Sequence, residues 1–313
     1  MPTHDSVMPV RTALTIGNFD GVHGGHGALV RSARSAVGAA GRVVALVFDP
    51  HPMTVIDPSR APGCLSAFGQ RVEWLRAVGV DEVIRLEPTR DLLGQSAEAF
   101  LDSVVAAYGP DFIVEGPDFR FGRGRRGTVE TLVRFGAEHG FETIVIDPVE
   151  ASLLDQSLVP VRSSTVRWLV ERGRVADAAR LLGRPLTLRG TVEQGDQRGR
   201  ELGFPTANVN TSLLLPADGI YAGSAAGPNG VVYPAAISIG VKPTFGERPR
   251  ACEAHLIGYD GPVGEYGWTI DLCFADWLRD QVAYDGIEPL LAQIDRDIEA
   301  TRDILGGASR VST

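Results

Sequence analysis

Short apolar runs alternate with amphipathic stretches over the first half of the chain. The runs are rich in Val, Ile and Leu and lack a polar alternate face, whereas the stretches between them have the apolar spacing of helices. The predicted strands are 12–17, 42–48, 81–87, 111–116 and 142–147, and the predicted helices are 26–37, 70–78, 96–107 and 128–139. This alternation predicts an α/β fold with a doubly wound parallel sheet, covered by helices on both faces.

The pattern changes near residue 183. Two further helical segments, 163–173 and 175–183, end at Gly183, and Pro185 follows in an apparent linker. Short strand-like pieces separated by Gly, Pro and Asn turns come next, at 186–192, 219–226, 231–240, 251–258 and 268–275. They predict an antiparallel sheet or small β-barrel. We therefore expect two domains, residues 1–183 and 184–313.

The last predicted element is a C-terminal helix over 286–305. Its apolar residues recur at helical spacing, which predicts a stripe that packs against the barrel: Ile287, Leu290, Leu291, Ile294 and Ile298.

Composition excludes several classes of protein. The formal net charge of −9 disfavours a nucleic-acid partner, because binding a polyanion requires neutralisation by Lys and Arg. Cys64, Cys252 and Cys273 are odd in number and show no C-x-x-C spacing, which argues for reduced thiols in the cytosol. No signal peptide or apolar run of bilayer length is visible, so we expect a cytoplasmic protein without a membrane partner. Self-association to a homo-oligomer is left open.

The turn after the first predicted strand carries candidate chemistry. Gly17 and Gly21 stand where ligands bind in open α/β sheets, and glycine lets a backbone approach phosphate closely. The following helix offers free N–H groups, and His23 and His26 are three residues apart, on one helix face. This predicts a phosphate site. A plain strand-to-helix turn and a metal site are the alternatives, the latter weak for lack of further ligands.

A second candidate loop, 190–209, begins the other half. Polar and glycine residues surround a Phe-Pro-Thr-Ala-Asn element with little apolar periodicity, which is typical of a ligand-binding loop.

These motifs together resemble a known family. Residues 17–26 match G-x-F-D-x-x-H-x-G-H, the nucleotidyltransferase signature, in the form found in bacterial bifunctional riboflavin kinase/FAD synthetases. Similar motifs follow in the family's order at 48–52, 116–127 and 161–170. Residues 190–208 match the riboflavin kinase motif at every defined position. The resemblance implies a Rossmann-like nucleotidyltransferase domain followed by a riboflavin kinase β-barrel with a C-terminal helix.

By this resemblance the first domain would adenylylate FMN to FAD and release pyrophosphate. FMN phosphate attacks the α-phosphorus of ATP, so positioning and charge stabilisation carry the catalysis. His23 and His26 would contact the triphosphate. The other binding candidates implied here are Gly17, Asn18, Phe19, Asp20, Asp118, Ser163, Ser164 and Arg167. The serines also fit a plain helix N-cap, and the basic loop 122–127 also fits a solvated surface loop; the role of His51 stays open.

By the same resemblance the second domain would phosphorylate riboflavin to FMN with ATP. Thr206 and Asn208 would help hold Mg²⁺ and the ATP phosphates, and Glu253 would be the general base. In an extended strand Glu253 lies on the face opposite Cys252 and Ala254; its alternative is an exposed carboxylate. Further binding candidates are Gly195, Gly199, Arg200, Pro205, Lys242, Pro243, Thr244 and Arg279.

Some positions depart from the family pattern. Gly24 and Thr165 stand where relatives often have basic residues, and Gln281 replaces an acidic one. The leading hypothesis is the bifunctional enzyme, with riboflavin, FMN and FAD as substrates and products. The alternatives are a riboflavin kinase whose first domain has lost or changed its adenylyl acceptor, and a non-catalytic flavin- or nucleotide-binding regulator.

Overall fold

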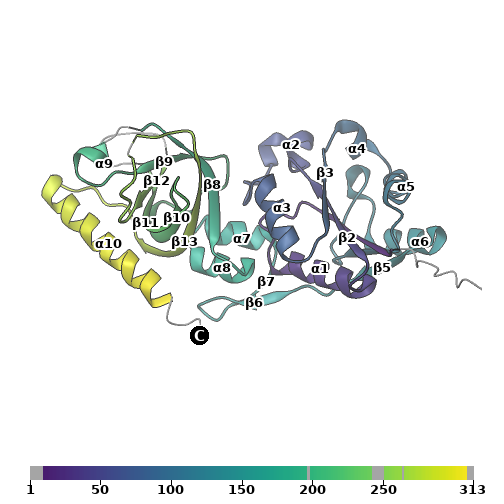
Figure 1. Ribbon diagram of the computed structural model, residues 1–313. Helices are drawn as coiled ribbons and strands as arrows, with labels where there is room; N and C mark the ends of the chain where they lie inside the picture. Colours follow the sequence, from purple (N-terminus) through teal and green to yellow (C-terminus); the bar gives the residue numbers. More distant parts are fainter. Residues whose placement is uncertain (1–9, 196–197, 242–249, 263, 309–313) are drawn as a thin grey trace, which may run out of the picture. The chain divides into compact units, whose positions relative to one another are not determined.

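The computed structural model describes residues 10–195, 198–241, 250–262 and 264–308 (Figure 1). The chain divides into two compact units. The first comprises Met1–Pro62 and Phe68–Glu150, and the second comprises Gly63–Ala67 and Ala151–Thr313.

The first unit is built on five parallel strands, in the spatial order β3-β2-β1-β4-β5. The strands are β1 (Thr12–Gly17), β2 (Arg42–Phe48), β3 (Glu82–Leu86), β4 (Phe112–Glu115) and β5 (Glu142–Val145). The helices are α1 (Gly24–Val37), α2 (Met53–Ile56), α3 (Phe68–Ala77), α4 (Arg90–Gly94), α5 (Ala97–Tyr108) and α6 (Val129–His139), with 3-10 turns η1 (Pro58–Arg60) and η2 (Arg123–Arg125). The predicted parallel sheet is confirmed, and its predicted elements end within one or two residues of those observed.

Helices cover both faces of this sheet. Alternate strand residues such as Val43 and Ala45 pack against Val30 and Ala33 of α1 on one face. Their neighbours, including Val44 and Leu46, pack against α5 and α6 on the other face. Strands buried on both faces need continuous apolar runs, which explains why the sequence pattern predicts them well.

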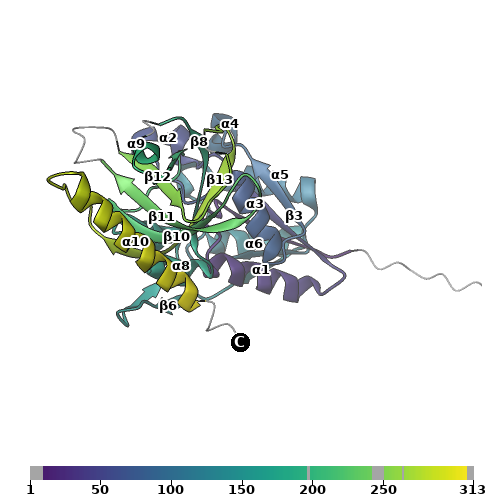
Figure 2. The ribbon, with the colours of Figure 1, turned by 60° about the vertical axis from the view of Figure 1, so that its left-hand side comes forward.

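The second unit is a closed barrel with the strand order β10-β11-β12-β9-β8-β13. Figure 2 shows barrel strands with α10 beside them. The strands are β8 (Leu186–Glu193), β9 (Ala207–Asn210), β10 (Gly219–Ala226), β11 (Val232–Gly240), β12 (Ala251–Leu256) and β13 (Thr269–Arg279). The unit also contains the small hairpin β6 (Glu150–Ser152) and β7 (Leu158–Pro160), and the helices α7 (Ser163–Val170), α8 (Val175–Leu182), α9 (Arg198–Glu201) and α10 (Ile287–Ala308). The predicted antiparallel barrel and C-terminal helix are confirmed.

Helix α8 belongs to this unit by packing, because it contacts β8 and β13 through buried residues such as Ala178 and Leu181. Compactness therefore divides the chain near residue 150, whereas the sequence pattern predicts a boundary near 183. The segment 151–182 accounts for the difference, and the functional boundary at 183 stays a prediction.

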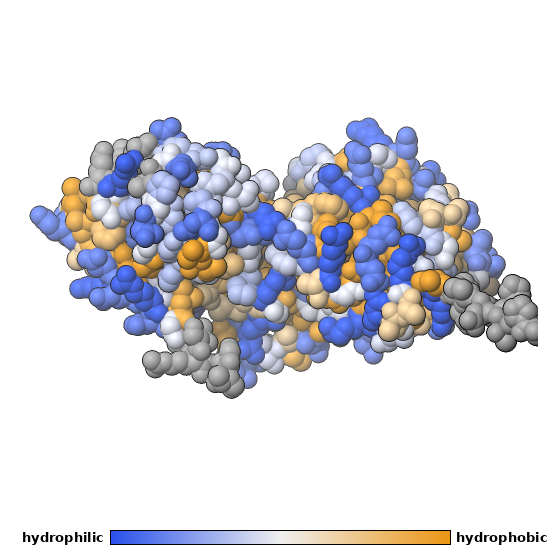
Figure 3. Space-filling model, viewed as in Figure 1, coloured by the Kyte–Doolittle hydropathy of each residue, from blue (hydrophilic) through white to orange (hydrophobic). Residues whose placement is uncertain are grey.

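Helix α10 packs against β10, β11 and β13. Ile298 is buried, and Leu290 and Ile294 line a cavity on the barrel, so most of the predicted stripe faces inward. Ile287 is the exception, with 56% of its surface exposed at the first residue of the helix. Figure 3 shows hydrophobic side chains at the surface near this end of the helix.

All three cysteines are free thiols, as expected, although only Cys252 is fully buried. Burial raises the pKa of the Cys252 thiol to about 12, so the thiol stays protonated. Within the described ranges, no helix combines the length and the apolar character that crossing a membrane requires.

Candidate functional site

Residues 18–23, here called the histidine turn, join β1 to α1 at the carboxyl ends of the strands in the first sheet. His23 is the N-cap residue of α1, and its Nδ1 accepts the backbone N–H of His26 at 3.4 Å. The Nδ1 of His26 in turn accepts the backbone N–H of His23 at 3.3 Å. A backbone N–H only donates, so both Nδ1 atoms are acceptors, and in the neutral rings the proton lies on Nε2. Each neutral ring therefore carries its one N–H donor at Nε2.

The turn is held in a costly backbone conformation. Phe19 and Val22 have φ values of 48° and 40°, a region that side-chain-bearing residues rarely adopt, and Val is β-branched. Both side chains are buried, and the backbone N–H of Val22 donates to Phe19 O at 3.1 Å. Such strain persists where the surroundings determine the conformation, and it is common at functional sites.

A cavity of about 340 Å³ lies beside this turn in the first unit. Gly17, Asn18 and Asp118, three of the predicted binding residues, line it together with His51. Aromatic side chains and the glycine-rich basic loop complete the wall, through Phe48, Phe100, Phe119, Phe121, Gly122, Gly124 and Arg125. The mixture of flat apolar surface with convergent polar groups suits a ring-bearing phosphorylated ligand.

The remaining predicted residues of the first site are placed differently. Phe19 and Asp20 are buried in the turn, and the Phe19 ring packs against the His26 ring with centroids 5.0 Å apart. Ser163, Ser164 and Arg167 lie on α7, in the second unit.

The N-cap interpretation of the serines is wrong, because the N-cap residue of α7 is Arg162. The Nε of Arg167 donates to Gly63 O at 2.7 Å. The binding roles of Phe19, Asp20, Ser163, Ser164 and Arg167 stay predictions.

Glu115, at the end of β4, is a buried carboxyl group that the sequence analysis does not single out. Its Oε1 accepts the backbone N–H of Ile16 at 2.6 Å. The β1–β4 ladder pairs residues only up to Leu14 and Ile113, so the Glu115 side chain replaces a ladder bond where the two strands separate. Burial raises the pKa of Glu115 well above its usual range.

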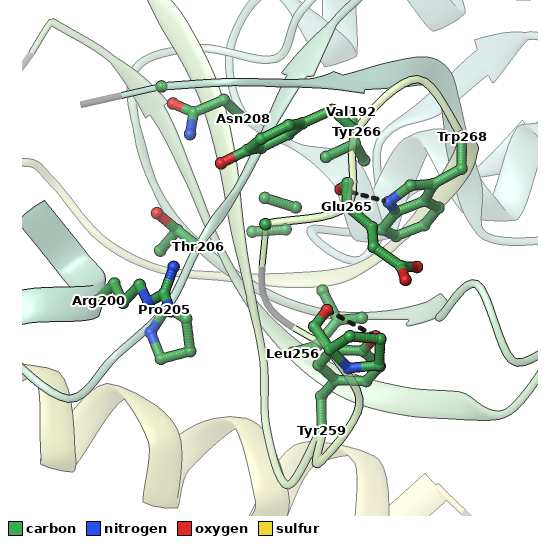
Figure 4. Close-up of a pocket in the computed structure, with 15 residues that line it drawn as sticks. Val192, Arg200, Pro205, Thr206, Asn208, Leu256, Tyr259, Glu265, Tyr266 and Trp268 are labelled. Atoms are coloured by element: carbon green, nitrogen blue, oxygen red, sulfur yellow. Dashed lines mark hydrogen bonds between the residues drawn. The ribbon is translucent and has the colours of Figure 1, made fainter. Parts of the chain in front are cut away.

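Two cavities lie on the barrel. The first, of about 90 Å³, is drawn in Figure 4 and is lined by five predicted residues, Gly195 and the labelled Arg200, Pro205, Thr206 and Asn208, with Tyr259, Tyr266 and Trp268 in its wall. A Cβ at Gly195 would collide with the Asn208 amide. A side chain at residue 195 would therefore require the Asn208 amide to move.

The second cavity, of about 210 Å³, lies between the outer face of the barrel and α10. Glu253 and Arg279, both predicted, line it, together with Gly199, Ser238 and Asp297. Glu253 is buried, on the strand face opposite the core residues Cys252 and Ala254, as expected. The alternative that Glu253 is an exposed carboxylate is wrong.

Thr206 lines both cavities, so they meet at its side chain. Glu253 and Asn208 are directly opposite partners in the β12–β9 pair, which puts their side chains on one face of the sheet. His255 supports this arrangement, because its Nδ1–H donates to Pro205 O at 2.9 Å. The geometry thus brings a buried carboxylate, a hydroxyl and an amide to the junction of the two cavities.

The sequence analysis missed Asp297, which joins α10 to the end of β13 beside the second cavity. Arg279 pairs with Asp297 in bidentate fashion, with Nε–Oδ1 at 3.0 Å and Nη2–Oδ2 at 2.7 Å. Gln281 donates from Nε2 to Ser238 Oγ at 3.0 Å. The predicted Lys242, Pro243 and Thr244 lie outside the described residues.

Comparisons with known proteins agree with this arrangement. A family model described as FAD synthetase matches residues 6–157, and one described as riboflavin kinase matches residues 182–305. A bifunctional riboflavin kinase/FMN adenylyltransferase of Escherichia coli strain K12 is 33% identical over 300 residues, covering 94% of this chain and 92% of that protein. The Listeria monocytogenes protein of the same description is 31% identical over 305 residues, covering 96% and 94%.

A solved Streptococcus pneumoniae structure, described as a macrolide-efflux protein, has a TM-score of 0.82 at 29% identity and covers 94% of this chain and 95% of that one. The agreement extends over both units of the chain. The chain carries an FAD synthetase domain and a riboflavin kinase domain, and it belongs to the family of bifunctional riboflavin kinase/FMN adenylyltransferases.

Proposed function

We propose that this chain converts riboflavin to FMN with one ATP, and FMN to FAD with a second ATP. The observation that supports the kinase activity is the junction of the two barrel cavities at Thr206. Glu253 lines one of these cavities, and Gly195 and Asn208 line the other. Two separate sites fit the two reactions, because each acts on a different phosphorus atom of ATP.

In the kinase site, riboflavin would lie in the cavity under α10 with its terminal hydroxyl toward Glu253. The Glu253 carboxylate takes the hydroxyl proton as the oxygen bonds to the γ-phosphorus, and the bond from that phosphorus to the bridging oxygen breaks to release ADP. Positioning by the cavity walls supplies much of the rate, since little covalent chemistry falls to the protein.

Magnesium fits the residues at this junction. Thr206 and Asn208 offer neutral oxygen donors, and Mg²⁺ commonly binds through few protein ligands together with substrate phosphates. Within the described ranges, no cluster of three His, Cys, Asp or Glu side chains could hold a metal ion. When bound, Mg²⁺ would neutralise charge that develops on the phosphates.

In the adenylyltransferase site, an FMN phosphate oxygen bonds to the α-phosphorus of ATP, and the bond to the β-phosphate oxygen breaks to release pyrophosphate. The Nε2–H groups of His23 and His26 would donate to the phosphate oxygens that gain charge. We assign this reaction to residues 1–183 and the kinase to residues 184–313; the phosphate-binding roles of Ser163, Ser164 and Arg167 stay predictions from the family resemblance. The cavity lined by Asn18, His51 and Asp118 would hold the ring system of one substrate.

The test is product analysis of the purified protein with riboflavin, ATP and Mg²⁺. FAD as final product supports the proposal. FMN alone would favour a kinase with a changed first domain, and no turnover would favour a binding protein. The free thiols support a reducing compartment, which we propose to be the cytoplasm, and the proposed partners are small molecules.

A further inference from the structure

We propose that Arg71 is a positioning residue for adenylyl transfer, which clamps the histidine turn to the end of β2. The inference rests on the adenylyltransferase activity proposed above. Arg71 lies on α3 and is only 4% exposed, although an arginine is rarely buried unless its groups are paired.

One guanidinium group joins the carboxyl ends of two neighbouring strands. Its Nη1 donates to Asn18 O at 3.1 Å, directly after β1, and to Phe48 O at 3.0 Å, at the end of β2. Its Nη2 forms an ion pair with Asp49. The planar fork of arginine can make these bonds at once, whereas the single ammonium of lysine cannot reproduce them.

The bond to Asn18 O acts on the strained part of the turn. That carbonyl belongs to the peptide before Phe19, whose φ is 48°. Residues held at such angles are strained, so neighbouring contacts must determine the conformation. Arg71 is such a contact, and His23 follows four residues after Phe19.

The side chain of Asn18 indicates what the clamp serves. Asn18 lines the cavity, and within the described ranges its buried Oδ1 has no hydrogen-bond partner. A buried acceptor without a partner is costly, and a donor on a bound substrate would satisfy it. Arg71 therefore fixes both the histidine turn and an acceptor aimed at the substrate.

The chain offers a matched control at the opposite edge of the same sheet. Arg34 on α1 donates from Nη1 to Gly41 O at 2.7 Å and from Nη2 to Gly79 O at 3.1 Å, and it pairs with Asp81. It thus makes a similar fork before β2 and β3, at their amino ends. Arg34 is more exposed than Arg71, at 31% against 5% of the side chain, but its bonds are of the same kind and it does not line the cavity.

The experiment compares Arg71→Lys with Arg34→Lys in the full-length protein, with FMN adenylylation and riboflavin phosphorylation measured separately. For Arg71→Lys we expect kcat of adenylylation to fall tenfold or more, with a smaller change in KM for ATP and an unchanged kinase rate. Arg34→Lys should keep adenylylation within about twofold. Unchanged adenylylation in Arg71→Lys, or equal losses in both variants, would overturn the inference.

A second variant tests the inference if Arg71→Lys does not fold. If circular dichroism shows that Arg71→Lys unfolds the first unit, Asp49→Asn decides, because it removes the ion pair with Arg71 and keeps the arginine; Arg85→Gln, which removes only the other ion pair of Asp49, is its control and should keep the wild-type rate. A fall in kcat of adenylylation of at least threefold supports the clamp, and a wild-type rate overturns it. A wild-type protein that makes FMN but no FAD would instead contradict the proposed function. Failure of the proposed function can therefore be told apart from failure of the positioning role of Arg71.

Discussion

The imidazole rings of His23 and His26 stack with centroids 3.7 Å apart, and each Nδ1 accepts the backbone N–H of the other residue. The Nδ1 edge of each ring therefore stabilises the start of α1. The other edge carries the proton that a phosphate oxygen can accept. In the proposed mechanism, folding and chemistry use different nitrogens of the same side chains, so substitution can separate the two roles.

Replacing His23 by Asn should separate these two uses. Asn is a good N-cap residue and keeps an acceptor near the position of Nδ1, but it does not extend to Nε2. We expect His23→Asn to melt close to wild type and to lose FAD synthesis. His23→Ala should lose FAD synthesis and also about 0.5–2 kcal/mol of stability. Thermal melts with both activity assays check this, and wild-type FAD synthesis by His23→Asn would refute the role of Nε2.

Replacing Gly195 by Ala should impair the kinase alone. The added Cβ would collide with the Asn208 amide and displace a proposed contact of the nucleotide phosphates. We expect KM for ATP in riboflavin phosphorylation to rise about tenfold, the cost of roughly 1.4 kcal/mol of binding. Gly306→Ala is the matched control, because nothing lies within 4 Å of its added Cβ. Equal kinetics in the two variants would contradict the assignment.

Replacing Asp297 by Asn should loosen α10 over the second cavity. The change weakens the bidentate pair with Arg279 and leaves a partly buried guanidinium poorly matched. We expect a higher KM for riboflavin, an unchanged KM for FMN in adenylylation, and a stability loss of about 1–3 kcal/mol. Asp295→Asn, two residues away and exposed, should change neither KM for riboflavin nor the stability. Steady-state kinetics and urea unfolding provide the measurement.

Glu115 predicts a pH dependence of stability. Its pKa is higher in the folded protein than in the unfolded chain, so the folded state binds more protons between those two values. The free energy of unfolding therefore falls as pH rises above the ordinary carboxyl pKa, by at most about 1.4 kcal/mol per pH unit. Glu115→Gln removes the carboxylate whose ionisation destabilises the folded state, and the glutamine amide oxygen can still accept the Ile16 N–H. Its stability advantage over wild type should grow from pH 5 to pH 8.

A stability difference between Glu115→Gln and wild type that stays constant with pH would mean that Glu115 does not titrate differently on folding.

Much of the fold follows from the sequence because buried parallel strands need apolar runs such as residues 42–48. Strand β9 does not follow, because Ala207–Asn210 lies in a polar loop and becomes a strand only by pairing with β8 and β12. The helical pattern of residues 163–182 predicts that they belong to the first half of the chain, whereas α8 packs on the barrel strands β8 and β13.

The candidate sites likewise contain residues that the sequence predicts and residues that only the structure reveals. Glycines and polar residues in a fixed order, as in residues 17–26 and 190–208, have a local sequence signal. Arg71, Glu115 and Asp297 do not, because a charged residue within a helix or strand is usually exposed and only the tertiary structure buries it.

The most direct measurement is a crossed assay of His26→Ala and Glu253→Gln, each tested for riboflavin phosphorylation and for adenylylation of supplied FMN. With two independent sites, His26→Ala should accumulate FMN without FAD. Glu253→Gln should form no FMN and still convert supplied FMN to FAD. A folded variant of either kind that loses both reactions would contradict the two-site account.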